Sequence, residues 1–385
     1  MAATNFHLRI YSSLEELEGI AAEWEALAAA QGRPLDTPVW HDCAYRCVHS
    51  AGEILHIMTL WCADQLVGIV PLVLTSTTGR PRFEIIGSRA LYEPANILAA
   101  SPEAAAQLVE ALASLEHPLL LTRIAQGGVF TELFRRRARA SGFVMQPSAS
   151  GTPYIDLDQG WESYYASLPS RLKNVIRRGE RQLKKSASVT CQFIRPGIDE
   201  IDALMDRAFR IESRGWKGRA GSAVLSRPDL RNFFFAYGRR LAARHELLVA
   251  FLLVDGEAVA MQFANISGNA YWQLKIGYDE QYAKQLVGLQ LQMAVIRWSF
   301  EQGLQRYEFL GTAQPWIHEW TPMVRPYRTF LFYPRNLAGM RALLADSVAR
   351  LRGRLFQSRA HATTSKPSQA RSTNSDTMRR LANDG

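Results

Sequence analysis

The sequence predicts a mixed α/β protein of two domains followed by a C-terminal tail. Short runs of β-branched and aromatic residues alternate with longer segments whose apolar residues recur every three or four positions. At 385 residues the chain exceeds the roughly 250 residues at which a single core stops growing. We expect domains at 1–150 and 151–335, a C-terminal helix at 336–357 and a disordered basic tail at 358–385.

The first domain is expected to begin with an edge strand at 6–11. Ser13, with Glu16 three residues later, has the pattern of a capping box, and the helix that it starts is expected to continue to Ala30. The segment 34–38 is expected to be a loop. The remaining elements are strands at 55–61, 66–74, 83–86 and 119–124, and helices at 102–115 and 130–140.

A strongly basic segment, 161–185, follows the first domain. Its apolar residues fall on one helical stripe, so its lysines and arginines are expected to point outward. The stripe consists of Leu168, Leu172, Val175, Ile176 and Leu183. A solvated helix face and an electropositive rim for a phosphate-bearing substrate both fit this pattern.

The second domain is expected to open with two helices, at 198–211 and 227–243, joined by a glycine-rich loop at 212–222. Asp255-Gly256 is typical of a hairpin turn, here between two apolar strands. Further elements are strands at 248–254, 258–266, 270–276, 307–310 and 328–333, and a short helix at 316–320.

A glycine stands where the long helix of the second domain begins, in the run Gln285-Leu-Val-Gly288. The first amides of a helix have no internal partners and its dipole is positive at that end, so such an end binds phosphate. A plain turn from chain into helix would also use a glycine here. Gly303 is placed to cap the other end of the helix.

The same run resembles the coenzyme A site of the GNAT acyltransferases, Gln/Arg-x-x-Gly-x-Gly/Ala, in which Gln285 and Gly288 match and Gln290 departs. Further sequence segments resemble the CelD-like and BioF-like branch of that superfamily, whose tandem architecture is similar to that of the FemABX peptidyltransferases. These segments are GYDE, GLQLQ, EQGLQRYEFLG and ESRGWKGRAGSA, and the resemblance covers most of residues 35–333. It implies two GNAT-like domains in tandem.

The resemblance also implies acetyl-CoA, or another acyl-CoA, as co-substrate and an amine as acceptor, such as an amino sugar or a polysaccharide or cell-envelope precursor. Coenzyme binding is expected at the backbone of the strand and of the helix entrance. The residues concerned are Lys275, Gly277, Gln285, Leu286, Val287, Gly288 and Leu289.

Acyl transfer to an amine needs a base, and the resemblance points to Glu308, where CelD-like relatives carry an acidic residue. Asp279 and His318 are further candidates, while a carboxylate that pairs with an arginine is the structural alternative for Glu308. The relatives often have a Tyr-Lys pair after Gly311, which this chain lacks. Acceptor contacts are expected from Trp216, Lys217, Trp272 and Tyr278.

The sequence has no Gly-x-Ser-x-Gly, His-Glu-x-x-His, Walker or Cys-x-x-Cys motif, and its four cysteines lack zinc spacing, so no metal site is expected. No apolar run is long enough to span a membrane and no signal peptide is apparent, which favours a cytoplasmic protein. Most of the net charge of +9 lies after residue 334, so nucleic acid is not expected as a partner of the body.

Three functions remain compatible with the sequence. The first is a coenzyme A-dependent N-acyltransferase, and the second is a FemABX-like aminoacyltransferase that uses charged tRNA, suggested by the basic run at 171–185. The third is a non-catalytic GNAT-fold binding protein, for which Gln290 and the missing Tyr-Lys pair would be signs of decay. Binding of acetyl-CoA without binding of tRNA separates the first from the second.

Overall fold

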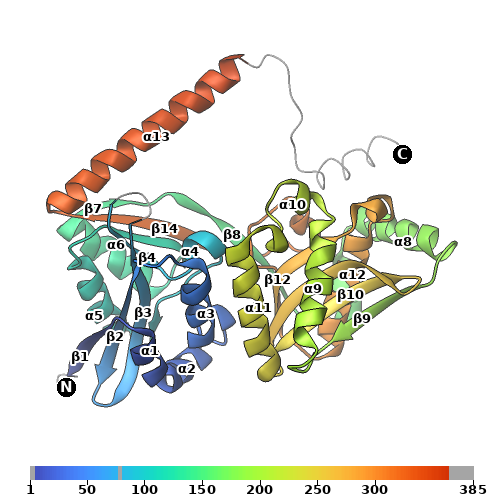
Figure 1. Cartoon of the computed structure of the whole chain (residues 1–385), viewed down its shortest axis with the longest axis horizontal. Coiled ribbons are helices and arrows are strands. Elements are labelled where there is room, and N and C mark those ends of the chain that lie inside the picture. Colours follow the sequence, from blue (N-terminus) through green and yellow to red (C-terminus); the bar gives the residue numbers. More distant parts are fainter. Residues whose placement is uncertain (1–4, 77–79, 364–385) are drawn as a thin grey trace.

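The computed structural model describes residues 5–76 and 80–363. Figure 1 shows two halves side by side, the N-terminal one largely blue and green and the C-terminal one largely yellow-green to orange. Within the described residues, no helix is both long and apolar enough to cross a membrane.

The N-terminal half begins as the sequence predicts, with a strand and a capped helix. The Glu16 amide donates to Ser13 Oγ at 3.2 Å, and the Ser13 amide donates to Glu16 Oε2 at 3.0 Å. The strands are β1 (Phe6–Tyr11), β2 (Ile54–Cys62), β3 (Gln65–Thr75), β4 (Arg82–Ile85), β5 (Leu98–Ala99), β6 (Leu119–Ala125) and β7 (Gly142–Met145). The helices are α1 (Leu14–Gly19), α2 (Ala21–Ala29), η1 (Pro34–Asp36), α3 (Pro38–Val48), α4 (Ser88–Leu91), α5 (Pro102–Ala113) and α6 (Val129–Ser141).

The C-terminal half contains the glycine-led helix. Its strands are β8 (Ser148–Asp156), β9 (Val189–Ile194), β10 (Leu247–Val254), β11 (Glu257–Ser267), β12 (Ala270–Tyr278) and β13 (Arg306–Glu308), while the last strand, β14 (Val324–Pro334), returns to the N-terminal half (Figure 1). Its helices are α7 (Trp161–Ser167), α8 (Ser170–Lys184), α9 (Ile201–Ser213), α10 (Trp216–Arg219), η2 (Val224–Ser226), α11 (Pro228–Ala243), η3 (Glu280–Gln285), α12 (Val287–Glu301) and η4 (Ile317–Glu319). The last helix, α13 (Leu337–Thr363), follows β14 and begins beside it at the N-terminal half (Figure 1).

One large mixed sheet runs through both halves, in the order β1-β2-β3-β4-β6-β14-β8-β13-β12-β11-β10-β9. Strand β5 pairs with β3, and β7 pairs with β14. The join between the halves is β14, which lies between β6 and β8 although it comes last in the chain. The mixed α/β class predicted from the sequence is confirmed.

Helices cover both faces of the sheet. One face is packed by α1 to α3 in the N-terminal half and by α9 and α11 in the C-terminal half. The other is packed by α5 and α6 in the first half and by α7, α8 and α12 in the second. Strand β10 lies between two such layers, and for this reason all eight of its residues are buried. The two halves touch where Trp40 packs edge-on against Phe233 and Tyr237, with ring centroids 5.0 and 5.1 Å apart.

The structure differs from the sequence-based expectation at several elements. The helix expected to reach Ala30 breaks at Ile20, where φ is −115°. Segment 34–38, expected as a loop, forms η1 and the first residue of α3. Strands β5, β7, β8 and β9 were not expected. The last helix continues past 357 to Thr363, and the predicted tail lies outside the described residues from 364 onward.

Candidate active site

A pocket of about 260 Å³ opens where two parallel strands of the C-terminal half separate. Strand β12 pairs with β13 only from Ala270 to Trp272. Beyond that point the chain after β13 follows β8, with the Phe309 amide donating to the Pro153 carbonyl at 3.1 Å. Strand β12 stays with β11 as far as Tyr278. The edge of β12 that faces the pocket therefore carries backbone groups without a strand partner.

A β-bulge at Leu274 changes which way β12 presents its side chains. The pairing with β11 runs from Ala264 opposite Gln273 to Phe263 opposite Lys275, so Leu274 is the extra residue. Leu274 packs in the core beneath α9 and α11, and Lys275 Nζ lies 4.8 Å from the Phe234 ring of α11. The bulge thus directs Lys275 away from α12.

The entrance of α12 borders one end of the pocket. Leu286 is left-handed, with φ 57° and ψ 36°, and its carbonyl accepts the amides of Leu289 and Gln290 at 2.9 and 3.0 Å. The amides of Val287 and Gly288 come before these and have no carbonyl within the helix to bind. They form the positive end of the helix dipole.

Gln290, the departure from the GNAT motif, supports this entrance from inside. Its side chain is 7% exposed, and Nε2 donates to the Gln285 carbonyl at 2.7 Å. The loop also packs closely on α8, because a Cβ on Gly179 would lie 2.5 Å from the Gln285 oxygen. The ring of Tyr278 covers Gly288, since a Cβ there would be 3.1 Å from Tyr278 Cδ1.

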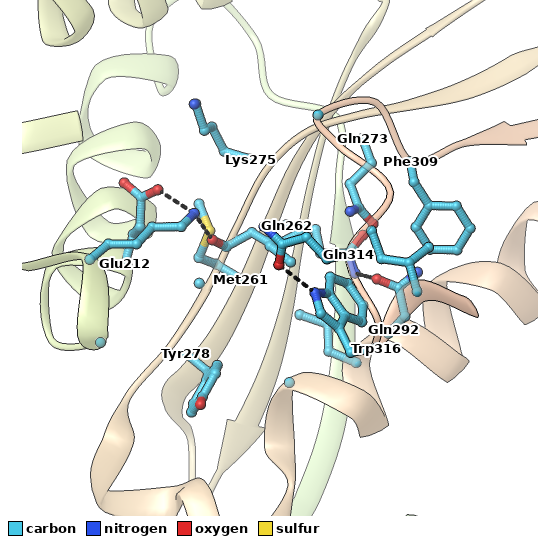
Figure 2. A pocket seen from close by; sticks show the side chains of 18 of the residues that line it. Glu212, Met261, Gln262, Gln273, Lys275, Tyr278, Gln292, Phe309, Gln314 and Trp316 are labelled. Atoms are coloured by element: carbon cyan, nitrogen blue, oxygen red, sulfur yellow. Dashed lines mark hydrogen bonds and ion pairs between the residues drawn. The ribbon is translucent and has the colours of Figure 1, made fainter. Parts of the chain in front are cut away.

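A buried hydrogen-bond network forms the floor of the pocket (Figure 2). Gln262 Nε2 donates to Gln292 Oε1 at 3.0 Å, and Gln292 Nε2 donates to Tyr307 Oη at 2.8 Å. Tyr307 in turn donates to Gln273 Oε1 at 2.6 Å, while Tyr271 bonds Gln262 at 3.0 Å. Burial raises the pKa of Tyr271 and Tyr307, so the network is neutral and fixes the floor without adding charge.

The loop at 212–222, which contains Trp216 and Lys217, covers one side of the pocket and is called the flap below. Lys217 Nζ donates to Glu212 Oε1 at 2.9 Å and to the Ile276 carbonyl at 2.7 Å. Glu212 Oε2 also accepts the Val224 amide at 2.9 Å. Trp216 remains 40% exposed at the mouth. The Lys217 ammonium therefore ties the flap to β12 in this structure.

One pocket wall comes from the N-terminal half. Glu93 lines the pocket, and its Oε2 accepts the Gly311 amide at 3.0 Å. Arg123, fully buried, donates to the carbonyls of Tyr92 and Gly311 and so fixes the Glu93 loop to the chain after β13. Burial raises the pKa of Glu93, while Lys275 and Arg123 oppose that rise. Sequence reasoning missed Glu93, because no motif surrounds it.

The three expected catalytic residues do not line this pocket. Glu308 is 2% exposed and paired with Arg325, whose Nη2 lies 2.8 Å from Oε1. Asp279 accepts the Gln281 amide at 3.0 Å as the cap of η3 and lies 3.5 Å from Arg214. His318 is exposed on η4. The catalytic roles of these three residues stay predictions. The ion pair of Glu308 with Arg325 is what the structural interpretation of Glu308 predicts.

Most of the expected binding residues do line the pocket, and a few lie behind it. Those in the lining are Trp216, Lys217, Lys275, Gly277, Tyr278, Leu286, Gly288 and Leu289. Gln285 and Val287 belong to the helix entrance, and Val287 is buried beneath it. Trp272 packs in the core under α9 and α11. The lining residues that sequence reasoning missed include Glu93, Gln262, Gln273, Gln292 and Phe309.

The chain is similar to several known proteins. Residues 170–317 match the family model described as acetyltransferase (GNAT) domain. FemX is 10% identical with a TM-score of 0.56, covering 81% of this chain and 95% of that one. L-PGS from Bacillus licheniformis is 13% identical, with a TM-score of 0.48 over 86% and 96% of the two chains. A tandem GNAT protein from the clavulanic acid biosynthesis pathway is 14% identical, with a TM-score of 0.47 over 86% and 100%.

No curated protein matches the sequence. At 10% identity the likeness to FemX shows the fold alone, and its 81% coverage includes both halves of this chain. The family match falls on the segment that contains α8, the flap, the diverging strands and the helix entrance. Residues 170–317 therefore match the acetyltransferase (GNAT) domain, and the fold of the whole chain is similar to that of FemX.

Proposed function

We propose that the protein is an acyl-CoA-dependent N-acyltransferase that uses the pocket between β12 and β13. The single observation that carries this proposal is the divergence of these parallel strands toward the entrance of α12. A slot of this kind takes an extended thioester along β12, and the helix entrance receives its phosphates. Acetyl-CoA is the co-substrate that the resemblance to GNAT enzymes suggests.

The residues at the slot fit such a co-substrate. The amides of Val287 and Gly288 suit a pyrophosphate, and the free edge of β12 offers backbone groups for a chain of amides. Leu286, Leu289 and Ile276 add apolar contacts. Gln290, held to the Gln285 carbonyl, keeps the entrance in shape and so takes the place of the small residue of the motif.

The chain's own groups would serve the reaction in three ways. Backbone amides of β12 near Lys275 would stabilise an oxyanion on the thioester carbonyl. The neutral floor of Gln262, Gln273 and Gln292 excludes water and presents fixed dipoles. The flap tied by Lys217 closes the side on which an acceptor amine would enter. The acceptor suggested by the resemblance is an amino sugar or an envelope precursor.

Calorimetric titration of the full chain with acetyl-CoA and with free coenzyme A tests the proposal. We expect one site that binds both compounds, since the helix entrance contacts the part that they share. Adenosine, which lacks the pyrophosphate and the thioester arm, serves as the control and should bind at least tenfold more weakly. Absence of binding by either coenzyme would contradict the proposal.

A second candidate is a FemABX-like aminoacyltransferase that takes its acyl group from tRNA. The specific observation in its favour is the exposed basic face of α8, which packs beside η3 at the slot. This face comprises Arg171, Arg177, Arg178, Arg181 and Lys184. Titration with total aminoacyl-tRNA decides between the two: binding that competes with coenzyme A favours the second candidate, and coenzyme A binding alone favours the first.

A further inference from the structure

Two charged side chains reach the pocket from different halves of the molecule. Glu93 comes from the loop after α4, and Lys275 comes from β12. Each affects the pKa of the other, so their charges are near one another. Within the described residues no ion pair joins them, and both side chains line the same pocket.

The Glu93 carboxylate is held in one position. Oε2 accepts the Gly311 amide at 3.0 Å, and Arg123 binds the carbonyls of both Tyr92 and Gly311. Arg33 Nη2 adds a hydrogen bond of 3.2 Å to the Pro94 carbonyl. The backbone on both sides of the Gly311–Glu93 bond is thus held, which limits the positions that the carboxylate takes in the pocket lining.

The Lys275 ammonium has an unusual environment for a lysine in a pocket. Its neighbour in the described part of the chain is the face of Phe234 at 4.8 Å, with no acceptor oxygen at hydrogen-bonding distance. Burial and the Lys217 ammonium lower the pKa of Lys275, whereas Glu212 and Glu93 raise it. An anion bound here would supply the missing partner.

The other two charges of the pocket already have partners. Glu212 is 2% exposed and accepts from both Lys217 and the Val224 amide. Figure 2 shows Glu212 and Lys275 on one side of the pocket and Gln273 and Phe309 on the other. Glu93 and Lys275 are therefore the carboxylate and the ammonium left to meet a ligand on that side of the sheet.

We infer that the acceptor is an amine that also carries an acidic group, bound with its ammonium at Glu93 and its carboxylate or phosphate at Lys275. This inference rests on the proposed acyltransferase function and names the substrate class of the same site. A molecule with one positive and one negative end satisfies both side chains at once. A simple amine would leave Lys275 without a partner.

Glu93 then acts as the base. It takes one proton from the acceptor ammonium, and the neutral amine nitrogen forms a bond to the thioester carbonyl carbon. The carbon–sulfur bond breaks as a second proton leaves the nitrogen and reaches the departing thiolate. The products are the amide and free coenzyme A, and Glu93 returns its proton to water.

The test measures release of free thiol from acetyl-CoA by the full chain with matched pairs of acceptors. β-Alanine is compared with β-alaninamide, and 2-aminoethyl phosphate with ethanolamine. We expect kcat/KM to be at least tenfold higher for the acidic member of one pair, and the pair that responds identifies the acid as carboxylate or phosphate. Equal values within both pairs, or no release with any, would overturn the inference.

Variants assign the two ends of the acceptor. Lys275→Met, which keeps contact with Phe234, should abolish the preference by raising KM for the acidic acceptor alone, and Lys275→Arg should retain it. Glu93→Gln should lower kcat about 100-fold for every acceptor. Glu132→Gln is the matched control, because Glu132 is exposed on α6 and pairs with Arg135, and it should change neither constant.

Calorimetry with acetyl-CoA separates the inference from the function on which it rests. Glu93→Gln and Lys275→Met should bind acetyl-CoA within threefold of the parent. If the parent binds acetyl-CoA but does not prefer acidic acceptors, the acceptor class is wrong and the acyltransferase stands. If the parent does not bind acetyl-CoA, the proposed function itself fails.

Discussion

Glu308 ends β13 with its carboxylate buried and its charge balanced by one arginine. Arg325 Nη2 and Nε lie 2.8 and 3.4 Å from the two carboxylate oxygens. The guanidinium also lies 3.9 Å from the ring centroid of Tyr154 on β8. The pair therefore joins β13, β14 and β8, which is a structural task at the join between the halves.

The variant Glu308→Gln tests whether the main role of Glu308 is this structural ion pair with Arg325. We expect unfolding free energy to fall by about 1–3 kcal/mol, since Arg325 loses a charged partner at a partly buried site. Thiol release from acetyl-CoA should stay within twofold of the parent. Arg325→Gln should lose comparable stability. A rate that falls 100-fold at unchanged stability would instead make Glu308 the base.

His41 on α3 is buried against Trp24, with ring centroids 5.3 Å apart and no partner for Nδ1 in the described chain. Burial lowers the pKa of His41 to about 3. The unfolded chain binds a proton near its ordinary pKa of about 6.5, and the folded chain does not until about pH 3. Stability from this group is therefore present above pH 6.5 and is lost as the pH falls toward 3.

His41→Gln should remove this contribution. Between pH 6.5 and 4 the parent should lose up to about 1.4 kcal/mol per pH unit more than the variant. Urea denaturation at several pH values measures both slopes. His7→Gln, at an exposed site on β1, is the control and should follow the parent. Parallel slopes for the parent and His41→Gln would mean that His41 is protonated in the folded chain.

Helix α8 meets the segment that leads into α12 through a glycine, Gly179. A Cβ on Gly179 would lie 2.5 Å from the Gln285 carbonyl oxygen and 3.4 Å from Gln290 Nε2. Both neighbours belong to the hydrogen bond that shapes the entrance of α12. The basic helix is therefore part of the support of the site as well as a solvated surface.

The variant Gly179→Ala tests whether the close contact of α8 with Gln285 outweighs the higher helix propensity of alanine. In an open helix this change would stabilise by about 1 kcal/mol. Here we expect destabilisation of about 1–3 kcal/mol and weaker coenzyme A binding, because the loop must shift. Gly19→Ala, where nothing lies within 4 Å of the new Cβ, should not lower stability. Unchanged stability and affinity for Gly179→Ala would contradict the close packing.

At the scale of elements, the apolar periodicity of the sequence predicted the helices and strands whose apolar faces pack in the core. The stripe on α8 is buried as expected, at Leu172 and Ile176 for example, and β10 and β11 form the predicted hairpin. Strand β9 escaped prediction because it is an edge strand with exposed residues such as Cys191 and Gln192. The role of Gln290 also escaped, since it depends on the left-handed Leu286 before the helix.

The whole molecule is held together by β14. This strand lies between β6 and β8, pairs with β7, and comes from beyond the GNAT domain in the chain. Residues 1–150 therefore lack one central strand of their own sheet. Their β6 and β7 edges would be exposed as templates for association.

Separate expression of the two parts tests this dependence. We expect residues 1–150 to form no monomer on their own and to become soluble when produced together with 151–385. Size-exclusion chromatography and thermal unfolding measure both states. We also expect residues 1–150 alone not to bind coenzyme A. A cooperative, monomeric fragment 1–150 would show that β14 is dispensable to the first half.

Long-range assembly explains what the sequence did not reveal about the site. The helix entrance at Gly288 was predicted because a local motif marks it. Glu93 was not, because its place depends on the pairing of β14 and on the buried contacts of Arg123 with Gly311. Residues far apart in the chain and without local signatures meet only when the sheet is complete.

The central claim is that the entrance of α12 binds the phosphates of a coenzyme A thioester. Calorimetric titration of Gly288→Val with acetyl-CoA tests it most directly, because the new side chain meets Tyr278 and fills the approach to the amides. We expect at least a tenfold loss of affinity, about 1.4 kcal/mol. Gly303→Ala, at the other end of the helix with open space around it, should bind like the parent. A folded Gly288→Val protein that binds acetyl-CoA as tightly as the parent would contradict the account.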